Sequence, residues 1–234
     1  MSLDDAIRLT EILLALAFIQ QSIEHFHAPK DEQLLFIPRF FLSVLLLFGF
    51  RTQWVCLALV ILALFILRRF QGPYNGGSDR MGLLVLCCLC PINFIPILRW
   101  QETIFGYLAI QLVLSYFISG WVKIINPDWR NGRALRDVFQ FSAYPVSEAL
   151  RTWADWPRVL FLMSWSVILF ELLFPFTLIT QTMLIIGLMI AATFHLANAC
   201  LFGFNRFFWT WLAAYPSILW LQQRIFVVEQ LQLS

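Results

Sequence analysis

Charged residues are scarce in this chain. They make up 13% of its 234 residues, whereas soluble domains carry about 25%. Hydrophobic residues make up 60%, and the mean hydropathy is +0.76. This balance excludes an ordinary soluble globular protein. It predicts an all-α integral membrane protein that crosses the lipid bilayer many times.

Signals of several other protein classes are also missing. No basic patch with interleaved aromatic residues appears, so we expect no nucleic-acid partner. No basic segment precedes the first apolar run, which begins after Asp4 and Asp5, so we expect no cleaved signal peptide. The glycine-rich segment 72–80 lacks the Gly-Lys-Ser/Thr ending of a phosphate-binding loop. We expect Asp79 or Ser78 to cap the helix that follows, with anion or metal binding there as the alternative.

Cysteine is present without a ligand pattern. The five cysteines all lie in apolar runs: Cys56, Cys87, Cys88, Cys90 and Cys200. The cluster at 87–90 invites a redox or metal interpretation, but no second ligand pair at metal spacing accompanies it. His25 and His27 likewise lack a third and fourth ligand. We interpret the cysteines as small buried hydrophobic side chains and predict no metal site.

Apolar runs separated by turn signals predict about eight membrane helices. They cover residues 6–24, 34–50, 52–69, 81–98, 103–125, 158–174, 177–200 and 207–222. The 10 Trp and 24 Phe suit lipid-facing surfaces and interfacial belts. No soluble domain fits in what remains, so residues 1–234 are interpreted as a single membrane domain.

The polar segment 126–157 is too charged to cross a membrane. It predicts two short amphipathic helices between 133 and 153. Their apolar stripes are Ala134, Leu135, Val138 and Phe139, then Val146, Ala149, Leu150 and Trp153. Pro145 suits the start of the second helix, because its missing N–H has no helical partner there. Such helices either lie on the membrane surface or roof a cavity.

Polar residues recur along one face of the helix at 103–125. Gln111, Ser115, Ser119 and Lys123 are spaced four residues apart, so they share a face. An ammonium group in hydrocarbon is costly, so this face turns toward a bundle interior, a wet cavity or the interface. For the Gln and Ser residues, simple helix packing is the plainer interpretation, with ligand binding as the alternative.

The end of this helix resembles a known family. The sequence YFISGWVK at 116–123, followed by Trp129 and Gly132, resembles the vitamin K-dependent gamma-carboxylases. It also resembles the related bacterial "horizontally transferred transmembrane" (HTTM) domain family. Glu171, four residues before Pro175, and the stretch HLANACLFGFNRFFW that begins at residue 195 are similar to other parts of the family pattern. The resemblance covers most of 70–222.

The resemblance implies a membrane enzyme that works with a quinone or hydroquinone. Lys123 matches the lysine regarded as the catalytic base of the carboxylases. Glu171 and His195 are the other candidate catalytic residues, because ionisable groups within apolar runs are expensive. Candidate cofactor-binding residues are Gln111, Ser115, Ser119, Tyr116 and Trp129. A structural polar network, or a Lys123 that reaches the interface from its helix end, is the alternative for these residues.

A second hypothesis comes from a different class of protein. It is a non-catalytic membrane subunit that assists maturation, export or assembly of a partner membrane or secreted protein, with 133–153 as the docking face. The carboxylases continue into a large non-membrane domain that recognises their protein substrate. As the sequence stops at Ser234, we do not expect peptide carboxylation of that kind. A transporter is the weakest alternative, because no inverted repeat is evident.

Charge and resemblance disagree on membrane orientation. With eight spans, the loops at 25–33, 68–80, 126–157 and 203–206 share one side and carry nine basic residues, against four on the other side. The positive-inside rule places the first set in the cytoplasm and both termini outside. The resemblance implies the opposite, because the carboxylase active site faces the lumen. We predict the orientation from charge, in a bacterial inner or thylakoid-type membrane.

Overall fold

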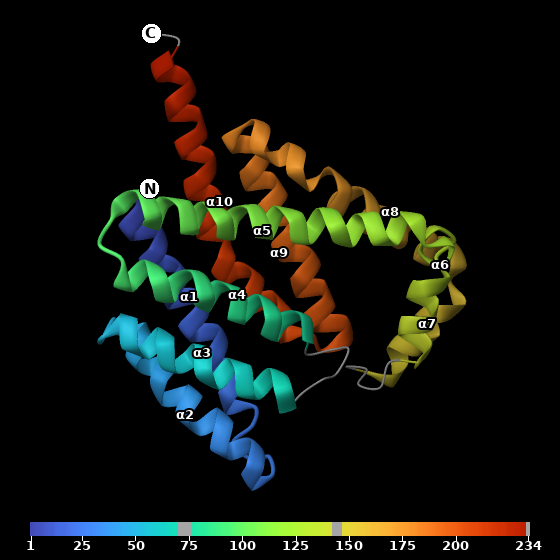
Figure 1. Ribbon diagram of the computed structural model, residues 1–234. Helices are drawn as coiled ribbons and strands as arrows, with labels where there is room; N and C mark the ends of the chain where they lie inside the picture. Colours follow the sequence, from blue (N-terminus) through green and yellow to red (C-terminus); the bar gives the residue numbers. More distant parts are fainter. Residues whose placement is uncertain (70–75, 142–146, 233–234) are drawn as a thin grey trace. The chain divides into compact units, whose positions relative to one another are not determined.

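Over the residues that the computed structural model describes, the secondary structure is helical, with turns and short loops between the helices and no strands. The described residues are 1–69, 76–141 and 147–232, with only the backbone described for 226–232 (Figure 1). The helices form two compact units. The first consists of Met1–Ile110 with Arg206–Ser234, and the second of Gln111–Asn205. This division is based on contacts between residues, so it does not test the prediction of a single membrane domain.

The first unit is built on an antiparallel bundle. Its helices are α1 (Leu3–Ile23), α2 (Lys30–Leu47), α3 (Thr52–Arg69), α4 (Gly76–Phe94), the first part of α5 (Leu98–Ile125), and α10 (Asn205–Gln232) after its first residue. Ser2 caps α1 by accepting a hydrogen bond from the Asp5 N–H, which satisfies one of its free donors. The core includes Leu14, Phe18 and Leu59, all almost fully buried, together with polar side chains such as Gln21 and Arg39.

The second unit contains the remainder of α5 and the helices that follow it. These are α6 (Pro127–Arg130), α7 (Arg133–Phe141), the 3₁₀ helix η1 (Glu148–Asp155), α8 (Pro157–Leu173), the 3₁₀ helix η2 (Phe174–Ile179) and α9 (Gln181–Phe202). Asn126 caps α6 through its side chain, and Thr180 caps α9 in the same way. α5 and α8 are therefore separated in sequence by a short polar segment of small helices.

Within the described part of the chain, five helices are long and apolar enough to cross a membrane. They are α1, α3, α5, α8 with η2 (Pro157–Ile179), and α9. Helices occur at all eight predicted positions, but the count of about eight spans is not confirmed. The difference has a physical cause in α2, which carries four charged residues among its 18. α4 likewise carries the adjacent charges of Asp79 and Arg80 near its start.

The expected helix cap at Asp79 or Ser78 is wrong. α4 begins at Gly76, so both residues lie inside its first turns instead of at the capping position. Their side chains are buried in the first unit, with exposed fractions of 1% for Ser78 and 6% for Asp79. The residues before Gly76 lie outside the described part of the chain, as do Pro145 and Val146 of the polar segment.

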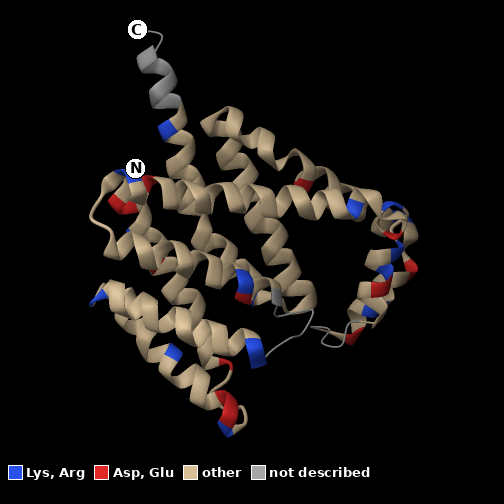
Figure 2. Cartoon of the chain, viewed as in Figure 1, with Lys and Arg blue, Asp and Glu red and all other residues tan. Residues whose placement is uncertain are grey.

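The polar segment packs its apolar stripe inside the second unit. Leu135 and Phe139 of α7 are buried against Ala154 of η1, Leu160 of α8 and Phe202 of α9. The second predicted helix is the 3₁₀ helix η1, which begins after its capping residue Ser147. Figure 2 shows charged residues gathered on α6 and α7, while α5, α8 and α9 carry few. The segment therefore covers the ends of α8 and α9 and turns its charges outward.

Candidate functional site

Lys123 and Glu171 form an ion pair between α5 and α8. The Lys123 Nζ atom lies 2.8 Å from Glu171 Oε1 and 2.6 Å from Oε2, so it donates to both oxygens. The Lys123 side chain is 16% exposed and that of Glu171 is 4% exposed. Trp129 adds a cation–π contact, with its ring centre 5.1 Å from Nζ. The lysine therefore has an anionic partner and an aromatic one, at a position where lipid would exclude a lone charge.

Gly120 makes this pair possible. It lies one turn before Lys123, against Glu171 and Leu172 of α8. A Cβ atom at Gly120 would lie 2.8 Å from the Leu172 backbone nitrogen and 2.9 Å from the Glu171 Cβ. Real Cβ atoms do not approach backbone atoms so closely, so a larger residue here would push the two helices apart. The glycine of the YFISGWVK pattern thus brings the carboxylate within reach of the lysine.

Tyr116 and His195 form a second polar pair, between α5 and α9. The Tyr116 hydroxyl lies 3.0 Å from His195 Nε2, within hydrogen-bond distance. Both residues are buried, and the Phe174 ring stacks beside Tyr116 with 4.2 Å between ring centres. An apolar wall thus surrounds the hydrogen bond and shields it from competition by water.

The two polar pairs lie on the same face of α5. Tyr116 and Lys123 are seven residues apart, which is about two helical turns or roughly 10 Å. α8 and α9 both direct an ionisable side chain onto this face, through Glu171 and His195. This is the arrangement that the hypothesis of a shared site requires. The roles assigned to these residues stay predictions.

The other predicted cofactor-binding residues differ in what they contact. Ser115 donates its hydroxyl proton to the Leu112 carbonyl of its own helix, 2.7 Å away, which fits a packing role. Gln111 and Ser119 are partly buried. Trp129 lies at the lysine, where its carbonyl also accepts a hydrogen bond from Ser164 of α8. Ser115 thus fits the packing interpretation, whereas Trp129 contacts Lys123.

An apolar groove runs between α8 and α9. It has a volume of about 400 Å³ and is lined mostly by Val167, Phe170, Ile186, Met189, Ile190 and Phe194. The Phe170 ring lies 5.7 Å from the Tyr116 ring and 6.0 Å from the Phe194 ring, centre to centre. The groove therefore reaches, through Phe170, the wall of the Tyr116–His195 pair. Its lining suits an apolar molecule.

Comparison with known protein families matches residues 95–222 to the HTTM domain. The match spans more than half of the chain. The chain belongs to the HTTM family. It is therefore a multi-pass integral membrane protein related to the membrane domain of the vitamin K-dependent carboxylases. No curated protein and no solved structure matches the chain.

The HTTM match includes Lys123, Glu171 and His195, all of which the sequence had singled out. It begins at residue 95, so the first 94 residues are outside it. Among the described residues, no three His, Cys, Asp or Glu side chains gather as a metal site would require.

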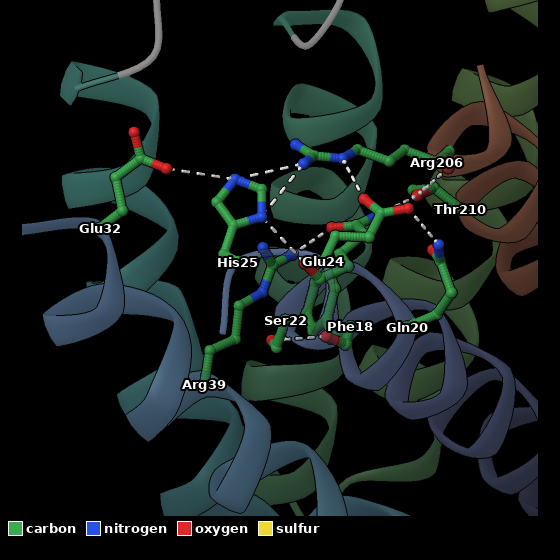
Figure 3. Close-up of polar contacts among 10 residues, drawn as sticks. Phe18, Gln20, Ser22, Glu24, His25, Glu32, Arg39, Arg206 and Thr210 are labelled. Carbon is green, nitrogen blue, oxygen red and sulfur yellow. Dashed lines mark hydrogen bonds and ion pairs between the residues drawn. The ribbon is translucent and has the colours of Figure 1, made fainter. Parts of the chain in front are cut away.

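A partly buried polar network in the first unit of this HTTM protein was missed by sequence reasoning. Arg206 Nε donates to Glu24 Oε2 at 3.2 Å, and Arg206 Nη2 lies 3.3 Å from His25 Nε2 (Figure 3). Arg39 Nη2 donates to Gln21 Oε1 at 2.8 Å. Arg39 lies within the apolar run at 34–50, which makes it visible in the sequence, but Arg206 lies 181 residues from His25. No local pattern could join them.

The environment of His25 disfavours its charged form. Burial lowers the pKa of His25 below its usual value of 6.5, and the nearby Arg206 guanidinium lowers it further. Glu32, 3.7 Å from His25 Nε2, acts in the opposite direction. The Phe36 ring stacks on the imidazole with 3.7 Å between centres. His25 lies beyond the end of α1, and Arg206 lies at the start of α10, so this network joins the ends of two helices of the first unit.

Proposed function

We propose that this HTTM protein is a membrane enzyme in which Lys123 acts as a base, with a quinone or hydroquinone as cofactor. The observation that supports the proposal is the ion pair of Lys123 with both oxygens of Glu171. The partial exposure of the lysine side chain lets another molecule approach it, while the carboxylate behind it is covered. The identity of the substrate lies beyond this proposal.

The pair offers a route to a neutral amine without burying a net charge. If one proton passes from Lys123 Nζ to a Glu171 oxygen, an ammonium and a carboxylate become an amine and a carboxylic acid. The total charge of the pair is zero before and after the transfer. In a low-dielectric setting, separated charges lose the solvation that favours them in water, so the neutral form becomes accessible. The amine can then accept a proton from a substrate.

The residues beside the pair fit a quinone-type cofactor. The groove between α8 and α9 is apolar, with aromatic walls at Phe170 and Phe194, and would hold an apolar ring or tail. Tyr116 and His195 form a hydrogen-bonded pair nearby and would bind a polar ring substituent. When bound, a hydroquinone supplies reducing equivalents and exchangeable hydroxyl protons. The protein's own contribution is to exclude water and to hold a proton at Lys123 or Glu171.

The test compares two cation exchanges in the purified protein. Arginine keeps the charge of Lys123 but does not act as a base near neutral pH. We therefore expect Lys123→Arg to reduce oxidation of an added hydroquinone by dissolved dioxygen, the two-electron acceptor of the assay, by roughly 100-fold or more, the usual contribution of a general base. The matched control is Arg136→Lys on the exposed face of α7, which should retain activity. Full activity in a folded Lys123→Arg protein would refute the base role.

A non-catalytic subunit is the second candidate, because the outer face of the polar segment is charged and exposed. Arg133 and Arg136 both project from α7 into solvent, while the opposite face is buried. Such a face could dock a partner membrane or secreted protein during its maturation, export or assembly. A polypeptide that co-purifies equally with the native protein and with Lys123→Ala would favour this candidate. A quinone extracted from the native protein would favour the enzyme. We place either protein in a bacterial inner or thylakoid-type membrane.

A further inference from the structure

A very small cavity lies between the first four helices of the first unit. Its volume is about 10 Å³. Its walls come from all four helices: Phe18 of α1, Arg39 of α2, Ala63 and Ile66 of α3, and Asp79 and Leu83 of α4. Four of these six side chains are apolar and two carry opposite charges. The cavity thus places a cation and an anion in an otherwise apolar chamber.

Both charged side chains have one polar atom without a partner. Arg39 is 4% exposed, and its Nη1 atom has no hydrogen-bond partner among the described residues. Asp79 is 6% exposed, and its Oδ2 atom is likewise unpartnered within the described part of the chain. No direct ion pair joins the two side chains, although each influences the other electrostatically. A buried polar atom without a partner is costly, so something must satisfy both.

We propose that this cavity is a binding site for one water molecule, which accepts a hydrogen bond from Arg39 Nη1 and donates one to Asp79 Oδ2. Water suits both atoms because it can accept and donate at once. A buried water needs at least two polar partners, and the cavity provides one donor and one acceptor.

Size and charge both select a single water over other occupants. One water occupies about 10–15 Å³ by this measure of cavity volume, so a larger ligand does not fit. A cation would meet the Arg39 guanidinium, and an anion would meet the Asp79 carboxylate. Since the two side-chain charges cancel, a neutral molecule is favoured.

The water would complete a polar network across the first unit. Arg39 already bonds to Gln21 of α1, and Gln21 Nε2 donates to Thr210 Oγ1 of α10 at 3.3 Å. The Arg39 guanidinium also lies over the Phe18 ring, 3.9 Å from its centre. Adding the water extends these contacts to Asp79, so that α1, α2, α4 and α10 become linked. The bound water would therefore stabilise the packing of these four helices in the first unit.

The test fills the cavity from an apolar wall. Ala63→Val adds two methyl groups that would displace the water and leave Arg39 and Asp79 unpaired. We expect the thermal unfolding midpoint to fall by roughly 4–10 °C. The matched background is Arg39→Met with Asp79→Leu, which removes the need for water. There, Ala63→Val should shift the midpoint by less than about 2 °C.

Two outcomes would overturn the water site. One is an equal effect of Ala63→Val in both backgrounds, which would indicate overpacking alone. The other comes from a high-resolution experimental structure of the native protein, which does not depend on how the variants fold. We expect a single density peak within hydrogen-bond distance of Arg39 Nη1 and Asp79 Oδ2. An empty cavity, or a direct ion pair between the two side chains, would contradict the proposal.

Discussion

Replacing Gly120 with alanine tests the close packing of α5 against α8. The added methyl group would lie 2.8 Å from the Leu172 backbone nitrogen and 2.9 Å from the Glu171 Cβ. The backbone of α8 cannot yield as a flexible side chain would. The two helices must therefore move apart, and the Lys123–Glu171 pair must lengthen. We expect the Gly120→Ala protein to fold, but with lower stability.

Two opposing terms give the magnitude. Overpacking typically costs about 1–3 kcal/mol, and contact with backbone places Gly120→Ala in the upper part of that range. Replacing a helical glycine with alanine contributes about 0.8–1 kcal/mol in the other direction. The net loss is about 1–2 kcal/mol. For a chain of this length, that corresponds to a fall of roughly 2–8 °C in the unfolding midpoint.

Gly106 provides the control within the same helix. A Cβ atom there would meet Leu221 and Trp220 side-chain atoms at 3.7 and 4.0 Å, which are ordinary contacts. Gly106→Ala should therefore keep the propensity gain and unfold at the native midpoint or slightly above it. Both variants can be followed by tryptophan fluorescence during heating in detergent. If Gly120→Ala proves as stable as Gly106→Ala, the conclusion that α5 and α8 pack closely at Gly120 is wrong.

Two further predictions concern the pH dependence of stability and the orientation in the membrane. Burial and Arg206 lower the pKa of His25 in the folded state. As the pH falls below about 6.5, His25 is therefore protonated in the unfolded chain before it is protonated in the folded protein, which favours unfolding. The unfolding midpoint should drop between about pH 7.5 and about pH 5.5. His25→Gln should reduce this drop and His27→Gln should not; equal slopes would refute the argument. The second prediction concerns membrane orientation and uses a variant in which the five native cysteines are replaced. On intact cells, a membrane-impermeant thiol reagent should label this variant when it carries Arg51→Cys, but not when it carries Arg133→Cys. The reverse result would reject the positive-inside assignment.

The sequence predicted helices well because hydropathy and turn residues are local signals. The helix predicted at 103–125 is α5 at Leu98–Ile125, and the one at 177–200 is α9 at Gln181–Phe202. The number of spans was harder to predict. Whether a moderately charged helix such as α2 crosses a membrane depends on what its charges contact. Arg39, for example, is satisfied in part by Gln21 inside the bundle.

The candidate site was predictable as a set of residues, but its pairings were not. Lys123, Glu171 and His195 stood out because each is ionisable within an apolar run. The structure adds that Lys123 pairs with Glu171 and His195 with Tyr116. Those partners are fixed by how α5, α8 and α9 pack, and a single sequence carries no signal of that packing. The contact of His25 with Arg206 was missed for the same reason.

The central claim is that Lys123 can present a neutral amine, and one chemical measurement tests it directly. Lys123 and Lys30 are the two lysines of the chain, and Lys30 is exposed at the start of α2. A small apolar amine-reactive reagent modifies neutral amines but not ammonium groups. Peptide mass spectrometry after brief treatment at neutral pH therefore compares the two residues within one protein.

If the proton can pass to Glu171, modification of Lys123 should keep pace with that of Lys30, although its side chain is only 16% exposed. Glu171→Gln removes the anion that stabilises the ammonium, so it should increase the modification of Lys123 and leave Lys30 unchanged. Complete modification of Lys30 with none at Lys123, in both the native protein and Glu171→Gln, would contradict the account.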